Sequence, residues 1–159
     1  MQVKNFSEIE AEFTRRVRKM IWCSVATIDA QGRPRSRILH PIWEGATGWI
    51  GTSPASHKAK HLDRNPYVSL AYITDVMNPV YVDCKAEWIY DLDEKRRIWN
   101  LFASTPEPVG YDPAHDFVSP ESEKWGVLKL IPWRIDLVSF PAPSFEEGTR
   151  IWRQEVERV

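Results

Sequence analysis

The sequence predicts a mainly β protein in which six or seven short strands form an antiparallel β-barrel with peripheral helices. Short segments rich in β-branched and aromatic residues follow one another along the chain. Tight turns join most of these segments, and strands joined by tight turns pair antiparallel. Helical patterns occur only at the start, between the third and fourth strands and near the end, which disfavours a doubly wound parallel sheet.

An amphipathic helix is predicted over residues 7–20. Ser7 and Glu10 have the spacing of a capping box at its start. Apolar residues recur on one face, at Ile9, Phe13, Val17 and Met20. The other face is basic and is expected to be solvated; it carries Arg15, Arg16, Arg18 and Lys19.

Strands are predicted at residues 22–29, 35–43, 49–52, 67–74, 80–90, 125–131 and 133–140. A turn signal at residues 30–33 joins the first two as a hairpin. Pro41 lies inside the second strand and indicates an edge or a bulge, because proline cannot donate to a β-ladder. Pro132 separates the last two segments.

Further helices are predicted over residues 55–64 and 93–104, and the first of these must stop before Pro66. Residues 105–122 follow the second helix and contain four prolines. A loop of this length inside a compact domain is usually a lid or a binding loop. A short helix is predicted in the tail, with apolar residues Ile151, Trp152 and Val156.

Length and composition fit one globular domain over residues 1–159, with 43% hydrophobic and 27% charged residues. A net charge of −1 gives no global attraction to nucleic acid or to an anionic membrane. No apolar run approaches the roughly 18 residues of a membrane span, and the N-terminus lacks the apolar core of a signal peptide. We therefore expect a cytoplasmic protein, with Cys23 and Cys84 buried on strands as small apolar residues.

The segment at residues 49–65 carries the strongest functional signal. A short strand ends at Gly51 and Thr52, and a predicted helix begins near Ser56, His57 and Lys58. These residues place a hydroxyl, an imidazole and an ammonium group at the positive end of a helix dipole, which suits a phosphate. An ordinary helix start with solvated lysines explains the same spacing, so the pattern alone leaves both interpretations open.

Two arginines strengthen the interpretation as a phosphate site. Arg35 and Arg37 are two residues apart on the second predicted strand, so they share one face of it. An arginine provides a bidentate clamp for a phosphate, and a lysine provides a point charge.

Other kinds of site have weaker support. His57 and His61 have the spacing of metal ligands on a helix, but the neighbouring Lys58 would repel a cation, so no metal is expected. The basic stretch at residues 33–37 resembles a nucleic-acid contact, yet the overall balance is acidic. No nucleophile with a nearby base is apparent. If the protein is an enzyme, a cofactor supplies the chemistry.

Five short motifs occur in order between residues 32 and 87. They are Gly32-Arg33-Pro34, Arg37, Thr52 with Ser56-His57-Lys58, Asn65-Pro66-Tyr67-Val68 and Lys85-Ala86-Glu87. In this order and spacing, residues 22 to about 90 resemble the pyridoxamine 5′-phosphate oxidase-like superfamily of FMN-binding proteins. The resemblance implies an antiparallel split β-barrel and a homodimer with FMN at the subunit interface.

The resemblance also implies roles for individual residues. Arg37, Ser56 and Lys58 would hold the FMN phosphate, and His57 occupies a position that is often basic in the family. The flavin and its ribityl chain would be lined by Ile38, Leu39, Gly51 and Thr52. Aromatic residues of the second subunit would complete the site, either Trp133 or residues near Asn78.

One family motif is missing. True pyridoxamine phosphate oxidases carry a C-terminal Arg-x-His motif, which the segment PWRIDLVSF lacks. The chain resembles instead the stress-protein and actinobacterial branches of the superfamily. The expected function is hydride transfer through FMN, to or from a small substrate or a nicotinamide donor. The alternatives are a deazaflavin-dependent reductase of the same fold and a non-catalytic flavin or haem binder.

Overall fold

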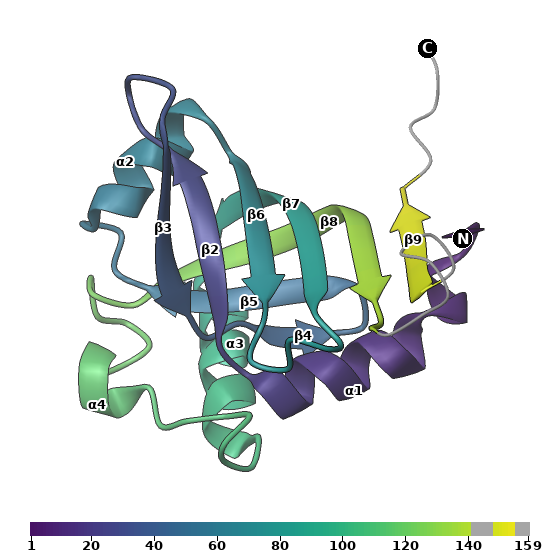
Figure 1. Cartoon of the computed structure of the whole chain (residues 1–159). Helices are drawn as coiled ribbons and strands as arrows, with labels where there is room; N and C mark the ends of the chain where they lie inside the picture. Colours follow the sequence, from purple (N-terminus) through teal and green to yellow (C-terminus); the bar gives the residue numbers. More distant parts are fainter. Residues whose placement is uncertain (141–147, 155–159) are drawn as a thin grey trace.

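The computed structural model describes residues 1–140 and 148–154 and is mainly β. Nine strands in these residues form one mixed sheet with the order β1-β9-β8-β7-β6-β2-β3, and β5 joins β8 to β4. The strands β5 and β8 cross behind β2, β3 and β6, while the helices lie at the periphery (Figure 1). The mainly β class with peripheral helices is confirmed.

The elements have the following bounds. The strands are β1 (Gln2–Val3), β2 (Cys23–Ile28), β3 (Pro34–Leu39), β4 (Ile42–Glu44), β5 (Thr47–Thr52), β6 (Tyr67–Tyr72), β7 (Val80–Ile89), β8 (Gly126–Val138) and β9 (Thr149–Arg153). The helices are the 3-10 helix η1 (Phe6–Glu8), α1 (Glu10–Met20), α2 (His57–Arg64), α3 (Leu92–Ser104) and α4 (Ala114–Phe117).

The predicted antiparallel split barrel of six or seven strands is not confirmed, because the described residues form a mixed sheet of nine strands. The strands β3 and β4 do not pair with each other, so the sheet stays open between them, and β1 pairs with β9 in parallel. The predicted second strand is divided at His40-Pro41 into β3 and β4. Proline cannot continue a ladder as a donor, so the chain leaves β3 there and re-pairs with β5.

Two other segments also differ from the prediction. Residues 126–138 form one long strand through Pro132, because the pairing with β7 shifts register between Asp83 and Cys84 and this bulge accommodates the missing N–H group. The predicted tail helix is instead the strand β9, since residues 149–153 pair with both β8 and β1. Val156 of that predicted helix lies outside the described residues.

The first helix begins differently from the prediction. A 3-10 turn precedes α1, and the Glu8 carboxylate accepts hydrogen bonds from the backbone N–H groups of Lys4 (3.0 Å) and Asn5 (2.8 Å). The capping box is therefore formed by Asn5 and Glu8 rather than by Ser7 and Glu10.

Two buried clusters hold the elements together. The apolar face of α1 is buried against the strands of the main core, as the periodicity predicts, through Ile9, Phe13, Val17 and Met20. A second cluster lies under α3 and contains Phe102, Trp49 and Trp125. Cys23 and Cys84 are free and buried on strands, as predicted. In the described residues, no helix combines the length and the apolar character needed to cross a membrane.

Arg16 corrects the prediction of a solvated basic face on the first helix. The side chain is almost fully buried, and its guanidinium donates to the carbonyl oxygens of Pro79 and Val138 and to Oγ of Ser139. Its Nε also pairs with Glu12 (2.7 Å). The buried charge is tolerated because the guanidinium has several oxygen acceptors: the Glu12 carboxylate on α1, and three further oxygens beside the start of β7 and the end of β8.

Replacing Arg16 with Met should reduce the free energy of unfolding by about 3 kcal/mol, because several buried acceptors lose a charged donor. The midpoint of urea unfolding measures this change. Arg15→Met is the matched control, since Arg15 pairs with the same Glu12 but is largely exposed. A change of no more than about 0.5 kcal/mol is expected for this control. Equal effects of the two substitutions would contradict the structural role of Arg16.

Candidate functional site

An open pocket of about 680 Å³ lies between the end of β3 and the loop that follows α3. The strands contribute Ile38, Leu39 and Gly51 to its lining. Trp22 and His40 flank these strands and form part of the wall. The rest of the lining belongs to the loop and consists of Glu107, Pro108, Gly110, Tyr111, Asp112, His115, Asp116 and Phe117. The volume is in the range of small-molecule sites.

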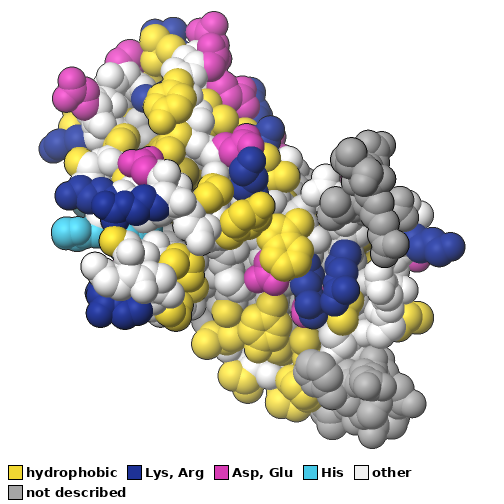
Figure 2. Space-filling model, turned by 90° about the horizontal axis from the view of Figure 1, so that it is seen from above, with side chains coloured by type: hydrophobic (Ala, Val, Ile, Leu, Met, Phe, Trp, Pro, Cys, Tyr) yellow, Lys and Arg dark blue, Asp and Glu magenta, His cyan; other side chains and the backbone are white. Residues whose placement is uncertain are grey.

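A pair of cations lies next to the strand side of this pocket. Arg37 precedes Ile38 on β3, and Lys58 lies in the first turn of α2. Burial, and after it the charge of Arg37, lowers the pKa of the Lys58 ammonium, so the two groups are close enough to repel each other. Burial also lowers the pKa of Arg37, with a smaller contribution from Arg35. Figure 2 shows basic side chains gathered around a His on the left, the side where Figure 1 places α2.

The contacts of Arg37 and Lys58 in the described residues are with neutral groups. Nη1 of Arg37 donates to the carbonyl oxygen of Val25 (3.2 Å) and to Oγ1 of Thr27 (2.7 Å). Nζ of Lys58 donates to Oγ of Ser56 (3.2 Å). Neither cation forms an ion pair within the part of the chain that the structure describes. No carboxylate in the described residues therefore compensates the positive charge of this pair.

The side chain of Thr27, on β2, is hydrogen-bonded both to Arg37 on β3 and to His61 on α2. Its side chain is 1% exposed, and its Oγ1 accepts the hydrogen bond from Arg37. The same hydroxyl is hydrogen-bonded to Nδ1 of His61 on α2, at 2.8 Å. This chain of two hydrogen bonds fixes the guanidinium of Arg37 relative to the helix that carries Lys58.

The start of α2 presents further donors. Ser56 is the N-cap residue and has an extended backbone, but its side chain makes no capping hydrogen bond. The N-terminus of a helix has backbone N–H groups without an internal partner and carries a partial positive charge. The arrangement of Arg37, Lys58, Ser56 and this helix end is therefore suited to bind an anion with several oxygens, as a phosphate has.

The structure places the nine predicted site residues in several environments. Ile38, Leu39 and Gly51 line the pocket. Arg37 and Lys58 are the pair of cations described above, and Ser56 accepts a hydrogen bond from Lys58. His57 is exposed at the first position of α2, and Thr52 is buried at the end of β5. Trp133 lies on β8 seven residues after Gly126, the partner of Thr52, and does not line the pocket of its own chain.

Gly51 has a packing role that the sequence does not reveal. A Cβ atom at this position would lie 2.3 Å from Cζ3 of Trp125 and 3.1 Å from the hydroxyl of Tyr111. Any side chain here would displace the buried Trp125. Gly51 therefore lets the second core cluster and the loop approach β5, in addition to lining the pocket.

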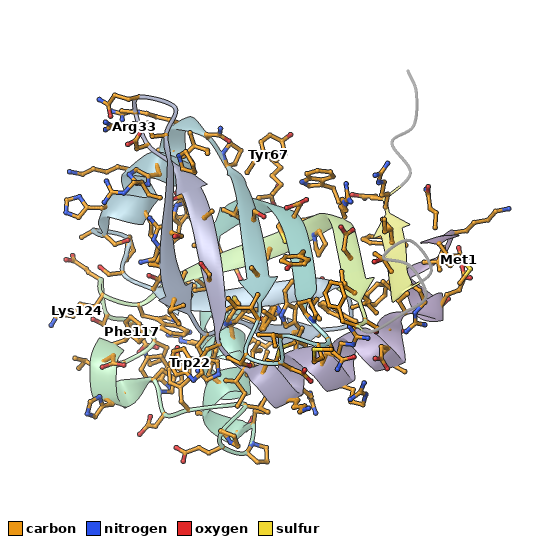
Figure 3. All side chains as sticks on the ribbon, viewed as in Figure 1. Met1, Trp22, Arg33, Tyr67, Phe117 and Lys124 are labelled. Atoms are coloured by element: carbon orange, nitrogen blue, oxygen red, sulfur yellow. The ribbon has the colours of Figure 1, made fainter. Side chains whose placement is uncertain are left out.

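Prediction from sequence missed the aromatic wall of the pocket. His40 contacts both Trp22 and Tyr111 at tilted angles, with ring centroids 4.7 and 5.0 Å away. Its Nε2 donates to the carbonyl oxygen of Val109 (2.7 Å). Trp22 and Phe117 lie below the end of β3 in Figure 3. The sequence identified residues 105–122 as a binding loop, but it contained no signal that paired individual loop residues with His40.

Comparison with known proteins identifies the family. The family model for pyridoxamine 5′-phosphate oxidase matches residues 9–131, so the chain belongs to this family. This result confirms the resemblance found in the sequence and extends it beyond residues 22–90. A comparison with curated proteins gave no match.

Solved structures with the same fold were also found. A protein from Clostridium acetobutylicum related to general stress protein 26 has a TM-score of 0.70 and 12% identity, covering 92% of this chain and 94% of that one. A pyridoxamine 5′-phosphate oxidase-related, FMN-binding protein from Nostoc punctiforme has a TM-score of 0.66 and 13% identity, covering 96% and 100%. An F420 reductase has a TM-score of 0.52 and 13% identity, covering 72% and 88%.

His40 should make the stability of the protein depend on pH below about 6.5. Burial lowers the pKa of its imidazole, with a smaller opposing effect from the hydrogen bond to Val109. Just below this pH the His40 imidazole is protonated in the unfolded chain but stays largely neutral in the folded chain. The free energy of unfolding therefore falls as the pH decreases through about 6.5. Urea unfolding at several pH values between about 7 and about 5.5 measures this slope.

The matched control for His40 is His115, which lies in the same loop region but is largely exposed. His40→Gln should flatten the slope, whereas His115→Gln should leave it as in the wild type. The same slope in all three proteins would show that His40 does not control acid stability.

Proposed function

We propose that the protein is an FMN-binding oxidoreductase in which Arg37, Ser56 and Lys58 bind the cofactor phosphate. The observation that carries the proposal is the pair of half-buried cations, Arg37 and Lys58, which repel each other and have only neutral partners in the described residues. A doubly charged anion between them would replace this repulsion by two attractive contacts. Each hydrogen bond with a charged group contributes roughly 1.5–3 kcal/mol.

The pocket beside the cations fits the flavin ring in chemical character. Ile38, Leu39 and Gly51 offer an apolar surface next to the phosphate site. A bound flavin supplies hydride transfer. The residues of this chain would anchor the phosphate, exclude water from the ring and orient it against β3. Similarity of fold to the FMN-binding protein from Nostoc punctiforme supports this choice of cofactor.

The substrate is expected to differ from a vitamin B6 phosphate. The region of the chain that lacks the Arg-x-His motif reads Arg134-Ile135-Asp136, and the Arg134 guanidinium is held by Asp136 through two contacts of 2.8 Å. An arginine paired in this way is a poor partner for a second anion. We therefore propose a reductase or oxidase that acts on another small molecule and exchanges hydride with a nicotinamide donor.

A deazaflavin coenzyme is the second candidate, favoured by the similarity of fold to an F420 reductase. Arg35 and Lys60 are exposed next to the proposed phosphate site and would be available to a longer anionic tail. The non-catalytic alternative, a flavin or haem binder, stays a prediction, as does the cytoplasmic location.

We further propose a homodimer in which the partner subunit completes the site. Large apolar side chains are exposed on adjacent strands: Tyr67 on β6, Tyr81 on β7 and Trp133 on β8. The register of β6 and β7 puts Tyr67 and Tyr81 on the same face of the sheet, and Trp133 lies at the bulge beside them. The polar pair Ser69 and Asp83 lies between Tyr67 and Tyr81 on this face. Several large apolar side chains exposed on one face of a sheet favour an interface. Trp133 would then reach the flavin of the other subunit.

Removing one phosphate contact should weaken FMN binding. Lys58→Ala and Arg37→Ala are each expected to raise the dissociation constant for FMN about 10- to 100-fold, as measured by flavin fluorescence. Lys60→Ala is the control, because Lys60 lies exposed on the same helix. Riboflavin, which lacks the phosphate, should bind equally to wild type and variants.

The same titration separates the alternatives. Equal loss of FMN and riboflavin affinity in Lys58→Ala would contradict the phosphate assignment. Tighter binding of a deazaflavin coenzyme than of FMN would favour the second candidate. A wild-type protein that binds FMN but whose flavin absorbance is not bleached by NADH or NADPH without oxygen would contradict the proposed hydride transfer.

Mixing two defective variants tests the homodimer. If Trp133 acts across the interface, Trp133→Ala and Arg37→Ala should each bind FMN weakly alone. After subunit exchange in a 1:1 mixture, about a quarter of all sites would contain both intact residues and regain tight binding. Light scattering should report a dimer, and Tyr90→Ala is a control because Tyr90 is exposed after the end of β7. A monomer, or no recovery on mixing, would overturn the proposal.

A further inference from the structure

The pocket and the cation pair have opposite charges. Apart from the histidines His40 and His115, each ionisable acidic or basic residue of the lining is a carboxylate: Glu107 and Asp112 on the loop after α3, and Asp116 on α4. Within the described residues, no lysine or arginine contributes to this lining. The cations Arg37 and Lys58 lie outside it, beyond the strand side. The site is thus divided into a cationic end at α2 and an acidic end at the loop.

The acidic end forms the open side of the pocket: Asp112 and Asp116 line it and are exposed to solvent, and Oδ1 of Asp116 lies 3.1 Å from Nδ1 of His115. Burial, and after it the charge of Asp116, raises the pKa of the Tyr111 phenol, so this carboxylate lies close to a side chain that is itself half-buried in the lining. The Tyr111 hydroxyl in turn approaches the backbone of Gly51 on β5. The charge of Asp116 therefore acts on the space above the strands and not only on solvent.

Two strained turns lie next to aromatic residues of the pocket lining. Ile21 has φ 68° and ψ −62°, and the N–H of Trp22 donates to the carbonyl of Met20 (2.8 Å). Val118 has φ 73° and ψ −61°, and the N–H of Ser119 donates to the carbonyl of Phe117 (2.9 Å). Both are γ-turns with positive φ at a β-branched residue, a conformation that is rare and costly.

Each of these turns adjoins an aromatic residue of the pocket, namely Trp22 and Phe117. Residues held in such conformations cluster at ligand sites, where the surrounding structure fixes them. Together with His40 and Tyr111, they give the loop side of the pocket flat faces of the kind that bind a planar ring.

We propose that the loop side of the pocket selects a planar, neutral or cationic substrate and rejects anionic ones, with Asp112 and Asp116 as the specificity-determining residues. A cationic ring would be attracted by both carboxylates and by the aromatic faces. A phosphorylated or carboxylated ring would bring its charge next to like charges and be repelled. This proposal deepens the proposed function, since it concerns the substrate that would react with the flavin.

The test uses three planar probes that share one ring and differ in charge: N1-methylnicotinamide (cation), nicotinamide (neutral) and nicotinate (anion). Their dissociation constants are measured on the FMN-loaded protein by tryptophan fluorescence. The cation is expected to bind at least as tightly as the neutral compound. The anion should bind about 10-fold more weakly or worse, equivalent to about 1.4 kcal/mol.

The double variant Asp112→Asn, Asp116→Asn should lose this discrimination. Asparagine keeps an oxygen that can accept the hydrogen bond which Ala114 N–H donates to Asp112 (2.9 Å), so the loop should retain its fold. Asp93→Asn is the control, because Asp93 lies on α3 with an exposed side chain and outside the pocket lining. It should preserve the wild-type order of affinities.

Three outcomes would overturn the inference: nicotinate binding as tightly as N1-methylnicotinamide, unchanged discrimination in the double variant, or no binding of any probe. The FMN dissociation constant is measured separately on each protein. If FMN does not bind, the proposed function is wrong. The order of probe affinities can then still be measured on the protein without cofactor, and it tests the charge selectivity by itself. The two failures are therefore distinguishable.

Discussion

The hydrogen bonds of Thr27 are the constraint on which the arrangement of the site depends. A single buried hydroxyl accepts a hydrogen bond from Arg37 on β3 and shares another with Nδ1 of His61 on α2. It therefore holds a strand and a helix at the distance at which Arg37 and Lys58 repel each other. The helix α2 is also anchored by its buried Ala59 and Leu62, and the hydrogen bonds of Thr27 add a polar connection beside the two cations. The hydrogen bonds of a neutral residue thus help to maintain an arrangement of two like charges that is electrostatically unfavourable.

The site also separates positive from negative charge between its two ends. Its cations lie on β3 and α2, which belong to the sheet and its attached helix, whereas its carboxylates lie on the loop after α3. The loop reaches the strands because Gly51 has no side chain, so that Trp125 and Tyr111 can pack on β5. One glycine therefore controls how closely the acidic end approaches the strands beside the cations.

Much of the fold follows from local patterns in the sequence. Alternation and turn signals predicted β2, β6 and β7 close to their observed bounds, and the apolar face of α1 was predicted residue by residue. The errors occur where long-range pairing overrides a local signal. Pro132 suggested a break, but a bulge opposite Cys84 keeps β8 continuous, and the tail became a strand because β8 and β1 offered it partners.

The sequence by itself determined where α2 begins and to which family the protein belongs. Ser56, His57 and Lys58 lie within one helical turn, so local signals were enough to predict the helix start, and their order relative to Arg37 indicated the family. Their role in binding a phosphate stays a prediction. Only the tertiary structure decided which residues face one another across the pocket and that Arg16 is buried. These facts depend on contacts between segments far apart in the chain, such as His40 with Val109 and Arg16 with Val138. No local pattern specifies such contacts, because they depend on how the sheet folds back on itself.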